Sequence, residues 1–288
     1  MHSLMQPTSP TANTALRPWN RPWWWCAQGE IPTLAWIIGI HLAAVAGAIL
    51  LPLPPWPVLV VATGLLFLGG LGTTIAYHRS LAHGGARLNL AAEQFLLFCA
   101  VLNGSGTPRS WVTFHRHHHK HSDSDDDISS PDHGLWWAHL RWLWQAPRVE
   151  TATYAPDMFK LRYRIWDMLL YPTLALSLFG GLLLTPWLGW ELAWASAAWL
   201  GPVRLVWALH TQCTVNSVCH LGAREEHGTG RNVRWLALIH LFQGENWHAN
   251  HHREPGRARL GLRWHQVDLG WYALLGLRAV GLVKRLRG

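Results

Sequence analysis

The chain has 288 residues, of which half are apolar and only 14% are charged. Soluble globular domains carry roughly 25% charged residues, so the composition argues against a soluble protein. The formal net charge of +8 suits either an anionic lipid surface or an acidic carrier group as a partner, although cytoplasmic loops rich in basic residues would also produce it. We expect no nucleic acid partner. The four cysteines form no C-x-x-C pair, which excludes a zinc ribbon and predicts reduced thiols.

Four apolar stretches predict membrane-spanning helices within a single domain that covers residues 1–288. A bilayer core requires about 20 consecutive apolar residues, and the stretches lie at about residues 34–51, 57–77, 168–187 and 192–212. Short connections join the first to the second and the third to the fourth. The predicted fold is therefore an all-α integral membrane protein with four transmembrane helices in two hairpins and a cytosolic helical cap.

The distribution of basic residues predicts the orientation of these spans. Of the 24 lysines and arginines, 23 lie in the N-terminal segment, in the segment from Arg79 to Arg164, or from Arg224 onward. Arg204, within the fourth span, is the exception, and the two short connections carry none. Because positively charged loops stay cytoplasmic, we expect both termini and the central segment on the cytoplasmic side.

Two further apolar stretches, Leu88–Leu102 and Val233–Phe242, are too short to cross a bilayer. Each precedes a group of histidines. We expect helices here, and two placements remain open: helices that lie in the membrane interface, or buried helices of the cytosolic cap.

Nine histidines and one asparagine form four groups at the ends of the predicted spans or in the cytoplasmic segments. They are His78 and His83; His115, His118 and His119; Asn216 and His220; and His248, His251 and His252. Residues three and four apart share a face of a helix, so each triad can direct its ring nitrogens inward together. The five-residue spacing of the first pair suits a helix end that unwinds.

The number and type of these side chains indicate two metal ions. Nine imidazoles exceed the four ligands of a structural zinc and the three of a catalytic zinc, and imidazole also binds iron, copper and nickel. No acidic residue stands where soluble di-iron bundles place their glutamates. An acidic run follows the second group, and its role stays open between hydrogen bonding to ligand rings and a solvated loop. Its members are Asp123, Asp125, Asp126 and Asp127.

The order and spacing of these groups resemble those of the stearoyl-CoA (delta-9) fatty acyl desaturase family. The chain reads H-x4-H, H-x-x-H-H, N-x-x-x-H and H-x-x-H-H, and the likeness extends to Leu71-Gly-Thr-Thr-Ile-Ala-Tyr-His-Arg79 and Gly244-Glu-Asn-Trp-His248. It reaches from the first span to about Trp271. The last group begins with histidine and not with the glutamine of front-end desaturases, which sets the chain apart from that class.

The resemblance implies two irons and an oxygen-dependent desaturation that leaves a cis double bond, at carbon nine by analogy. By position, the first iron would be bound by His78, His83, His115, His119 and His252. The second would be bound by His118, His220, His248 and His251, with Asn216 reaching it through a water. The implied partners are O2, membrane lipid, a long-chain acyl substrate carried by CoA, acyl carrier protein or a lipid, and an external electron donor of the ferredoxin or cytochrome b5 type.

Two alternatives use the same histidines differently. A membrane di-iron hydroxylase would oxygenate its substrate, although its histidine groups are spaced differently. A metal transporter or sensor would place ligands near the bilayer midplane, whereas here they lie at span ends. The other ten histidines are expected to have surface or packing roles, and His117 is expected to point away from the ligand face.

One face of the second span predicts a binding site for the acyl chain. Leu66, Gly70, Thr74 and His78 are spaced by four residues and therefore share a helix face. Leu66 lies about 18 Å deeper than His78 at 1.5 Å per residue, so we expect Leu66 to form the floor of a tunnel and Gly70 to lie where the chain passes the backbone. The other reading is that the glycines here only permit close helix packing.

Overall fold

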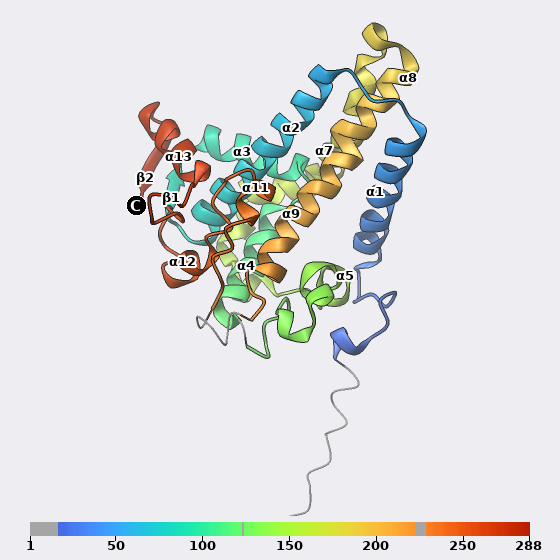
Figure 1. The fold of residues 1–288 in the computed structure, drawn as a ribbon. Helices are drawn as coiled ribbons and strands as arrows, with labels where there is room; N and C mark the ends of the chain where they lie inside the picture. The colour runs from blue at the N-terminus through green and yellow to red at the C-terminus, as the bar shows by residue number, and fades with distance from the viewer. Residues whose placement is uncertain (1–16, 123, 223–228) are drawn as a thin grey trace, which may run out of the picture.

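The computed structural model of the chain is mostly helical and describes residues 17–122, 124–222 and 229–288. Three of its helices are long and apolar enough to cross a membrane: Ile31–Leu50, Trp56–Ala82 and the continuous helical run Leu161–Val218. Figure 1 shows the long helices rising together from a cap of short helices and loops that holds α4 and α12.

The first two long helices do not pack mainly on each other. The helix α1 (Ile31–Leu50) and the helix α2 (Trp56–Leu71) are joined by a short proline-containing link. Both pack instead against the turn Trp199–Val203 and the helix that follows it. Gly47 of α1 allows this approach, because a Cβ there would lie 2.6 Å from the Cβ of Ala198.

The helix α2 continues without a break into a π-helix, Gly72–Ala82. The amide of His83 donates to the carbonyl of His78 over 3.2 Å, which is the five-residue hydrogen bond of a π-turn. The expectation of an unwound helix end between these two histidines is therefore wrong: a wider helix accommodates the five-residue spacing. π-helical turns of this kind occur frequently at functional sites.

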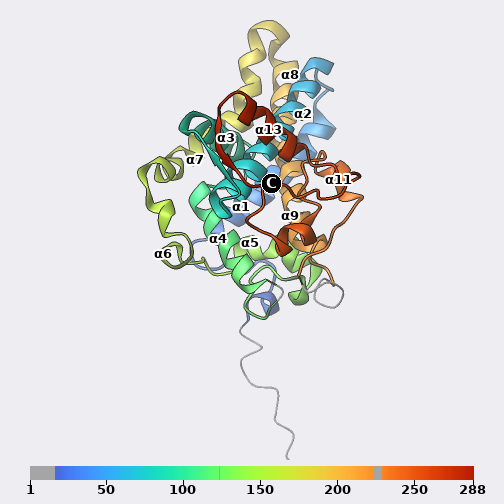
Figure 2. The same cartoon turned by 90° about the vertical axis from the view of Figure 1, so that its left-hand side faces the viewer.

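The third long run contains three α-helices: α7 (Leu161–Phe179), α8 (Thr185–Ala198) and α9 (Arg204–Val218). A 3₁₀ turn, Gly180–Leu184, joins the first two, and a π-helical turn, Trp199–Val203, joins the last two. Gly189 has φ +73°, a conformation that glycine adopts at little cost. Both views place α8 at the end of the molecule opposite α4 and α5 (Figures 1 and 2). Four separate spans in two hairpins remain a prediction.

The cap is built from shorter elements around the histidines. Its helices are α3 (Leu90–Leu102), α4 (Pro108–His121), α5 (Trp142–Gln145), α6 (Thr151–Tyr154), α11 (Leu236–Ile239), α12 (His248–Arg253) and α13 (Leu269–Ala279). Single 3₁₀ turns lie at Pro18–Asn20, Pro131–His133 and Pro156–Phe159, and a π-helical turn lies at Trp137–Arg141. The helix α4 begins at a proline after Thr107, whose hydroxyl accepts from the amide of Ser110, a favourable N-terminal cap.

The fold is not purely α-helical. The strand β1 (Ala86–Leu88) pairs with the strand β2 (Val283–Leu286) in an antiparallel ladder that ties the C-terminal segment to the chain just after His83. The chain is nevertheless mostly helical, as expected, and this two-stranded ladder is a small addition to the predicted fold. Strands of three and four residues are too short to show the alternation of apolar and polar side chains that marks a strand. The sequence pattern therefore did not reveal them.

Of the two short apolar stretches, one forms the expected helix. The helix α3 begins after Asn89, whose side chain accepts from the amide of Ala92, and one side of it is buried against α2 and the π-helix. Val233–Phe242 contains only the four-residue helix α11, and Leu241 and Phe242 have positive φ values. The helix expected over this whole stretch is therefore wrong.

Two buried arginines lock the long helices to the cap. Arg79, 1% exposed, pairs with Asp268 at 2.9 Å and donates to the carbonyls of Gln243 and Ala258. Arg204, the one basic residue of the fourth predicted span, donates to the side-chain oxygen of Asn103 at 2.6 Å and to backbone carbonyls. Each buried charge is thus matched by oxygens, as burial in a low-dielectric interior requires.

Candidate metal centre

The nine histidines of the four groups meet at one place in the cap, although they come from elements far apart in the chain. The π-helix brings His78, with His83 directly after it, and α4 brings its triad. His220 directly follows α9, and α12 brings the last triad. Most of the nine are buried. The sequence prediction that these side chains converge on one site is borne out by the geometry.

The ring nitrogens form two groups, each with all its ligand atoms within 4.8 Å of one another. One group holds His78, His83, His115, His119 and His251; the other holds His118, His220, His248 and His252. The partition implied by the resemblance exchanged His251 and His252 and is corrected here. The physical reason is helical spacing: His115 with His119, and His248 with His252, are each four residues apart and stay on one face.

The spacing of the nitrogens fits bound cations better than hydrogen bonds. The Nε2 atom of His251 lies 2.9 Å from the Nε2 atoms of both His78 and His119. The Nε2 atom of His248 lies 2.9 Å from that of His220 and 3.0 Å from that of His252. A neutral ring nitrogen either donates one hydrogen bond or accepts one, so a proton can pair the Nε2 atom of His251 or of His248 with only one of its two close neighbours.

The same distances match a coordination shell. Metal–imidazole bonds of about 2.1 Å place neighbouring ligand nitrogens roughly 3.0 Å apart and opposite ones roughly 4.2 Å apart. The observed close contacts of 2.8 to 3.0 Å and the 4.8 Å limit of each group are close to these values. The residues present therefore fit two metal ions, one in each group.

The histidines are held in the form that binds metal. Burial, and then the neighbouring rings, lower the pKa values of six of them well below 6.5: His83, His115, His119, His248, His251 and His252. A neutral imidazole has a free lone pair, whereas a protonated one cannot bind a cation. Near neutral pH these rings are ready to act as ligands.

Two carboxylates, Asp127, which is buried, and Glu245, which is partly buried, orient one ring in each group. Asp127, 0% exposed, has its Oδ2 atom 3.0 Å from Nδ1 of His118, and Oε2 of Glu245 lies 2.8 Å from Nδ1 of His78. Each contact fixes the proton on Nδ1 and leaves Nε2 free to face the site, the usual arrangement behind a metal-bound histidine. Asp125 and Asp126 are exposed, and Asp123 lies outside the described residues. The open question about the acidic run is thus answered for Asp127 alone.

Electrostatics keep both carboxylates ionised. Burial by itself would raise the pKa of Glu245, but His78, Arg79 and the hydroxyl of Thr74 outweigh it and lower that pKa to about 2. Burial likewise opposes ionisation of Asp127, and His118 together with the amide of Ser129 lowers its pKa below the usual range. An ionised acceptor makes the hydrogen bond to imidazole stronger than a neutral one would.

Three residues outside the two histidine groups test further sequence predictions: His117, Asn216 and Glu245. His117 contacts the rings of His121 and Tyr154 and belongs to neither group of ring nitrogens, as expected for a side chain that points away from the ligand face. Asn216 lies in the last turn of α9, four residues before His220, and its role as a ligand stays a prediction. Glu245 was not singled out, and its only signal was its position three residues before His248 in the quoted motif.

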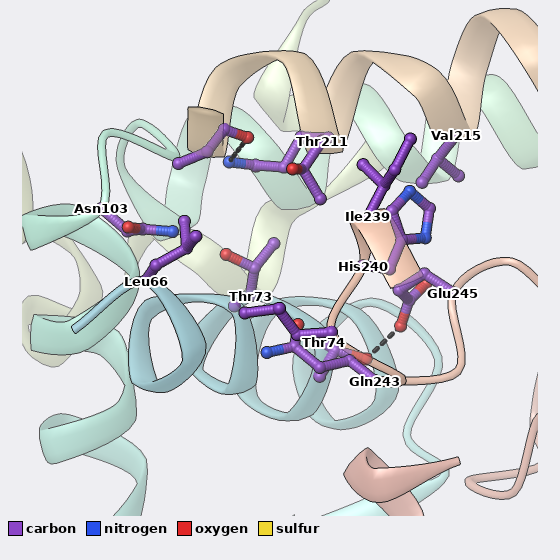
Figure 3. A pocket seen from close by; sticks show the side chains of 14 residues that line it. Leu66, Thr73, Thr74, Asn103, Thr211, Val215, Ile239, His240, Gln243 and Glu245 are labelled. Carbon is purple, nitrogen blue, oxygen red and sulfur yellow. Dashed lines mark hydrogen bonds between the residues drawn. The ribbon is translucent and has the colours of Figure 1, made fainter. Parts of the chain in front are cut away.

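A cavity of about 50 Å³ lies between α2 and α9 and extends to Glu245, the carboxylate that contacts His78. Its walls include the three residues predicted to line an acyl tunnel, Leu66, Gly70 and Thr74. Figure 3 shows the hydroxyl of Thr74 directed at Glu245, the carboxylate that holds His78. The predicted face of the second span therefore lines a cavity that ends at a carboxylate behind the first histidine group, and its role in binding an acyl chain stays a prediction.

The opposite wall comes from α9 and from the segment before α12, which includes the end of the short apolar stretch Val233–Phe242. His240 is buried, and its Nε2 lies 2.8 Å from the hydroxyl oxygen of Thr214. Burial lowers the pKa of His240 to about 4, so it is a neutral side chain of the wall. The amide of Gln243 occupies the space beside Gly70, where an added Cβ would come within 2.2 Å of it. Gly70 thus permits the approach of Gln243.

Comparison with known proteins gives the chain its family. The model of the fatty acid desaturase family matches residues 54–279. Delta-9 acyl-lipid desaturase 1 of Arabidopsis thaliana is 36% identical over 241 residues, which cover 79% of this chain and 74% of that protein. The chain belongs to the fatty acid desaturase family. It is accordingly an enzyme, an oxidoreductase that acts on acyl chains.

Two further relatives extend the match over most of the chain. The sn-1 stearoyl-lipid 9-desaturase of Anabaena variabilis is 32% identical over 282 residues, 91% of this chain and 97% of that protein. The chloroplastic palmitoyl-monogalactosyldiacylglycerol delta-7 desaturase of Arabidopsis thaliana is 33% identical over 279 residues, 92% of this chain and 70% of that protein. The resemblance read from the histidine groups is confirmed.

Proposed function

We propose that this desaturase is a di-iron enzyme that uses O2 to introduce a cis double bond at carbon nine of a long-chain saturated acyl group carried by a membrane lipid. The observation that carries the proposal is the pair of all-histidine groups whose Nε2 atoms converge at 2.8 to 3.0 Å. Relatives named as 9-desaturases of acyl lipids support the position and the carrier.

The reaction removes two hydrogens from adjacent methylenes and reduces O2 to two waters, with two electrons from a separate donor and two protons. Two irons, when bound, would supply the activation of O2. The ligands would be His78, His83, His115, His119 and His251 for one iron and His118, His220, His248 and His252 for the other. We propose that Asn216 contributes to the second site through a water, so Asn216→Ala should lower activity less than His220→Ala does.

The side chains around the metals position the substrate and keep water away. Glu245 and Asp127 hold His78 and His118 in a fixed tautomer, so the ligand geometry does not have to reorganise during the reaction. Leu66, Gly70 and Thr74 would hold the acyl chain on the α2 side of the cavity, and Val215 and Ile239 supply apolar surface opposite. An apolar wall excludes water from the reacting carbons.

We also propose that Leu161–Val218 crosses the bilayer twice, which would make four spans with the metal centre and both termini on the cytoplasmic side. The conformation of Gly189 and the place of α8, far from α4, support a turn there. Cysteines introduced at Leu53 and Trp187, both more than 70% exposed, should react with an impermeant maleimide from outside the cell. Labelling at either position only after cell lysis would refute the four-span arrangement.

The function is tested by expression in a host that lacks its own desaturase. Fatty acids are analysed by gas chromatography with location of the double bond, and iron is measured in the purified protein. The proposal expects a delta-9 cis product and two irons per chain. An alcohol product would identify a hydroxylase, and metal uptake without oxygen consumption would identify a transporter or sensor. Unsaturation at another carbon would refute the proposed position alone.

A further inference from the structure

A second cavity, of about 240 Å³, lies beside the segment that contains Ser80, Leu81 and Gly84 and shares no residue with the cavity at Leu66. It is bounded by the end of the π-helix, the strands β1 and β2, and the first turns of α3 and α7. Figure 1 shows β1 and β2 beside α13, away from α9. We call this space the basic cavity.

Four basic side chains from three separate segments line the basic cavity: Arg87, Arg162, Lys284 and Arg285. One acid, Glu93, faces them, and it is already engaged. Its carboxylate, 9% exposed, lies 3.6 Å from Nε of Arg162 and accepts from the hydroxyl of Tyr163 at 3.5 Å. In the part of the chain that the structure describes, Arg87, Lys284 and Arg285 form no ion pair.

The strand register forces two of these charges together. Arg87 and Arg285 are direct partners across the β1–β2 ladder, and like charges directly opposite each other in a sheet are destabilising. The ladder is irregular between Arg87 and Leu88, where Lys284 is left unpaired. The buried side chains of Ala86, Leu88 and Val283 favour this pairing, because a further slip of one residue would turn them to solvent. The fold therefore holds a surplus of positive charge in one cavity, where an anion would relieve the repulsion.

The position of the cavity selects the kind of anion. Ser80 and Leu81 of its wall end the candidate span Trp56–Ala82, and Arg162 stands at the start of the run Leu161–Val218. Leu90 in the wall and Leu161 beside it are 59% and 80% exposed, as expected for side chains that face lipid. Two spans thus meet the water beside the cavity, at the level of lipid head groups.

We propose that the basic cavity binds the phosphate of an anionic phospholipid of the bilayer. Guanidinium groups match the geometry of phosphate oxygens and can bind two at once, and basic pockets between helices at the cytoplasmic face suit such head groups. An anionic lipid fits better than phosphatidylcholine, because the ammonium of a choline head group would be repelled by Arg87, Lys284 and Arg285. The bound lipid is distinct from the acyl substrate, whose proposed cavity has other walls.

Binding is measured on the full chain, purified in a neutral detergent, by following its thermal unfolding as dioleoyl phosphatidylglycerol is added. The parent should be stabilised in a saturable manner, and dioleoyl phosphatidylcholine should have a weaker effect. In the Arg87→Gln/Arg285→Gln variant the midpoint of the phosphatidylglycerol titration should rise at least about tenfold, given the contribution of each basic residue near anionic lipid. Without lipid, this variant should be at least as stable as the parent.

The matched control is Arg234→Gln/Arg263→Gln, which removes two exposed arginines that do not line the cavity and should titrate like the parent. A separate titration with coenzyme A distinguishes a carrier phosphate from a lipid phosphate. The proposal is overturned if the Arg87→Gln/Arg285→Gln variant responds to phosphatidylglycerol as the parent does. It is also overturned if both double variants weaken equally, or if coenzyme A alone stabilises the chain through these arginines.

Discussion

Two clusters of histidines in this chain use their ring nitrogens in opposite ways. In the metal centre, Nε2 atoms of different rings crowd together, and those of His248 and His251 each have two Nε2 neighbours within 3.0 Å. In the second cluster, His210 bridges its neighbours with two different nitrogens: Nε2 faces His41 at 3.0 Å, and Nδ1 faces His139 at 2.8 Å.

The second cluster is a hydrogen-bonded chain. It begins at the carbonyl of Ile37, 2.7 Å from Nδ1 of His41, and ends at the hydroxyl of Ser217, 3.0 Å from Nδ1 of His139. Every ring nitrogen in it has its own partner, so protons alone can satisfy it. The convergent nitrogens of the metal centre need a cation between them to relieve their close approach. The bridging nitrogens of His41, His210 and His139 instead connect α1, α9 and the turn Trp137–Arg141 by hydrogen bonds. Proximity of histidines alone does not separate the two cases.

The largest expected effect separates the two clusters directly. His118→Ala removes a ligand from the second metal group and should lower bound iron and abolish desaturation, because the remaining three histidines leave that site incomplete. His210→Ala should retain both irons and measurable activity. Iron per chain and the unsaturated fraction of fatty acids are the measurements.

His117→Ala is the control within α4, since His117 contacts His121 and Tyr154 and belongs to neither histidine group. Full activity of the His118→Ala variant, or loss of iron from the His210→Ala variant, would contradict the distinction between convergent and bridging nitrogens.

A smaller effect is expected from the carboxylates behind the ligands. Asp127→Asn and Glu245→Gln keep the shape of the side chain but remove the ionised acceptor for His118 and His78. Loss of such a contact typically lowers metal affinity or activity about 10- to 100-fold. Chelator titration of bound iron measures the affinity, and Asp126→Asn, at an exposed position, is the control. Equal iron affinity in the parent and both variants would rule out the orienting role.

The bridging chain should affect stability rather than chemistry. His210→Phe fills a similar volume and leaves Nε2 of His41 and Nε2 of His139 without their partner. The rings are only half-buried, so the loss should be about 1–2 kcal/mol, the lower part of the range for an unpaired polar group. Thermal unfolding of the iron-loaded protein measures it, with His265→Phe at an exposed position as the control. Unchanged stability would show that the hydrogen bonds among His41, His210 and His139 do not hold the helices together.

The sequence predicted that the nine histidines converge, but it did not predict which of them belong to each of the two groups. Pairs four residues apart, such as His115 with His119, share a group because helix geometry is local. Whether His251 joins His78 or His118 depends on how α12 lies against the π-helix and α4, which no spacing within α12 encodes. The three-residue and four-residue strands and the π-helical course of Gly72–Ala82 likewise lack a local signature.

Contacts between residues that are distant in the chain could not be predicted from the sequence either. Asp127 could be weighed because it follows the second histidine group closely, but Glu245 reaches His78 over 167 residues of chain. The pairs His41–His210 and His139–His210 are separated by 169 and 71 residues, so no spacing in the sequence indicates that these histidines are partners. Spacing rules detect neighbours on one helix, and contacts between helices need the fold.

The smallest expected effect concerns which acyl chains the enzyme prefers. Leu66 of α2 lines the end of the cavity that lies farther from Glu245. Leu68, on the same helix, does not line the cavity. Leu66→Ala should deepen the site by the volume of the lost side chain and shift relative rates severalfold from 16-carbon toward 18- and 20-carbon chains. Leu68→Ala should leave the preference unchanged. These truncations are cleaner than an enlargement at Gly70, because a side chain there would displace Gln243. Relative rates on 14-, 16-, 18- and 20-carbon substrates decide the matter. An equal fall on all lengths would show that Leu66 only packs the helix.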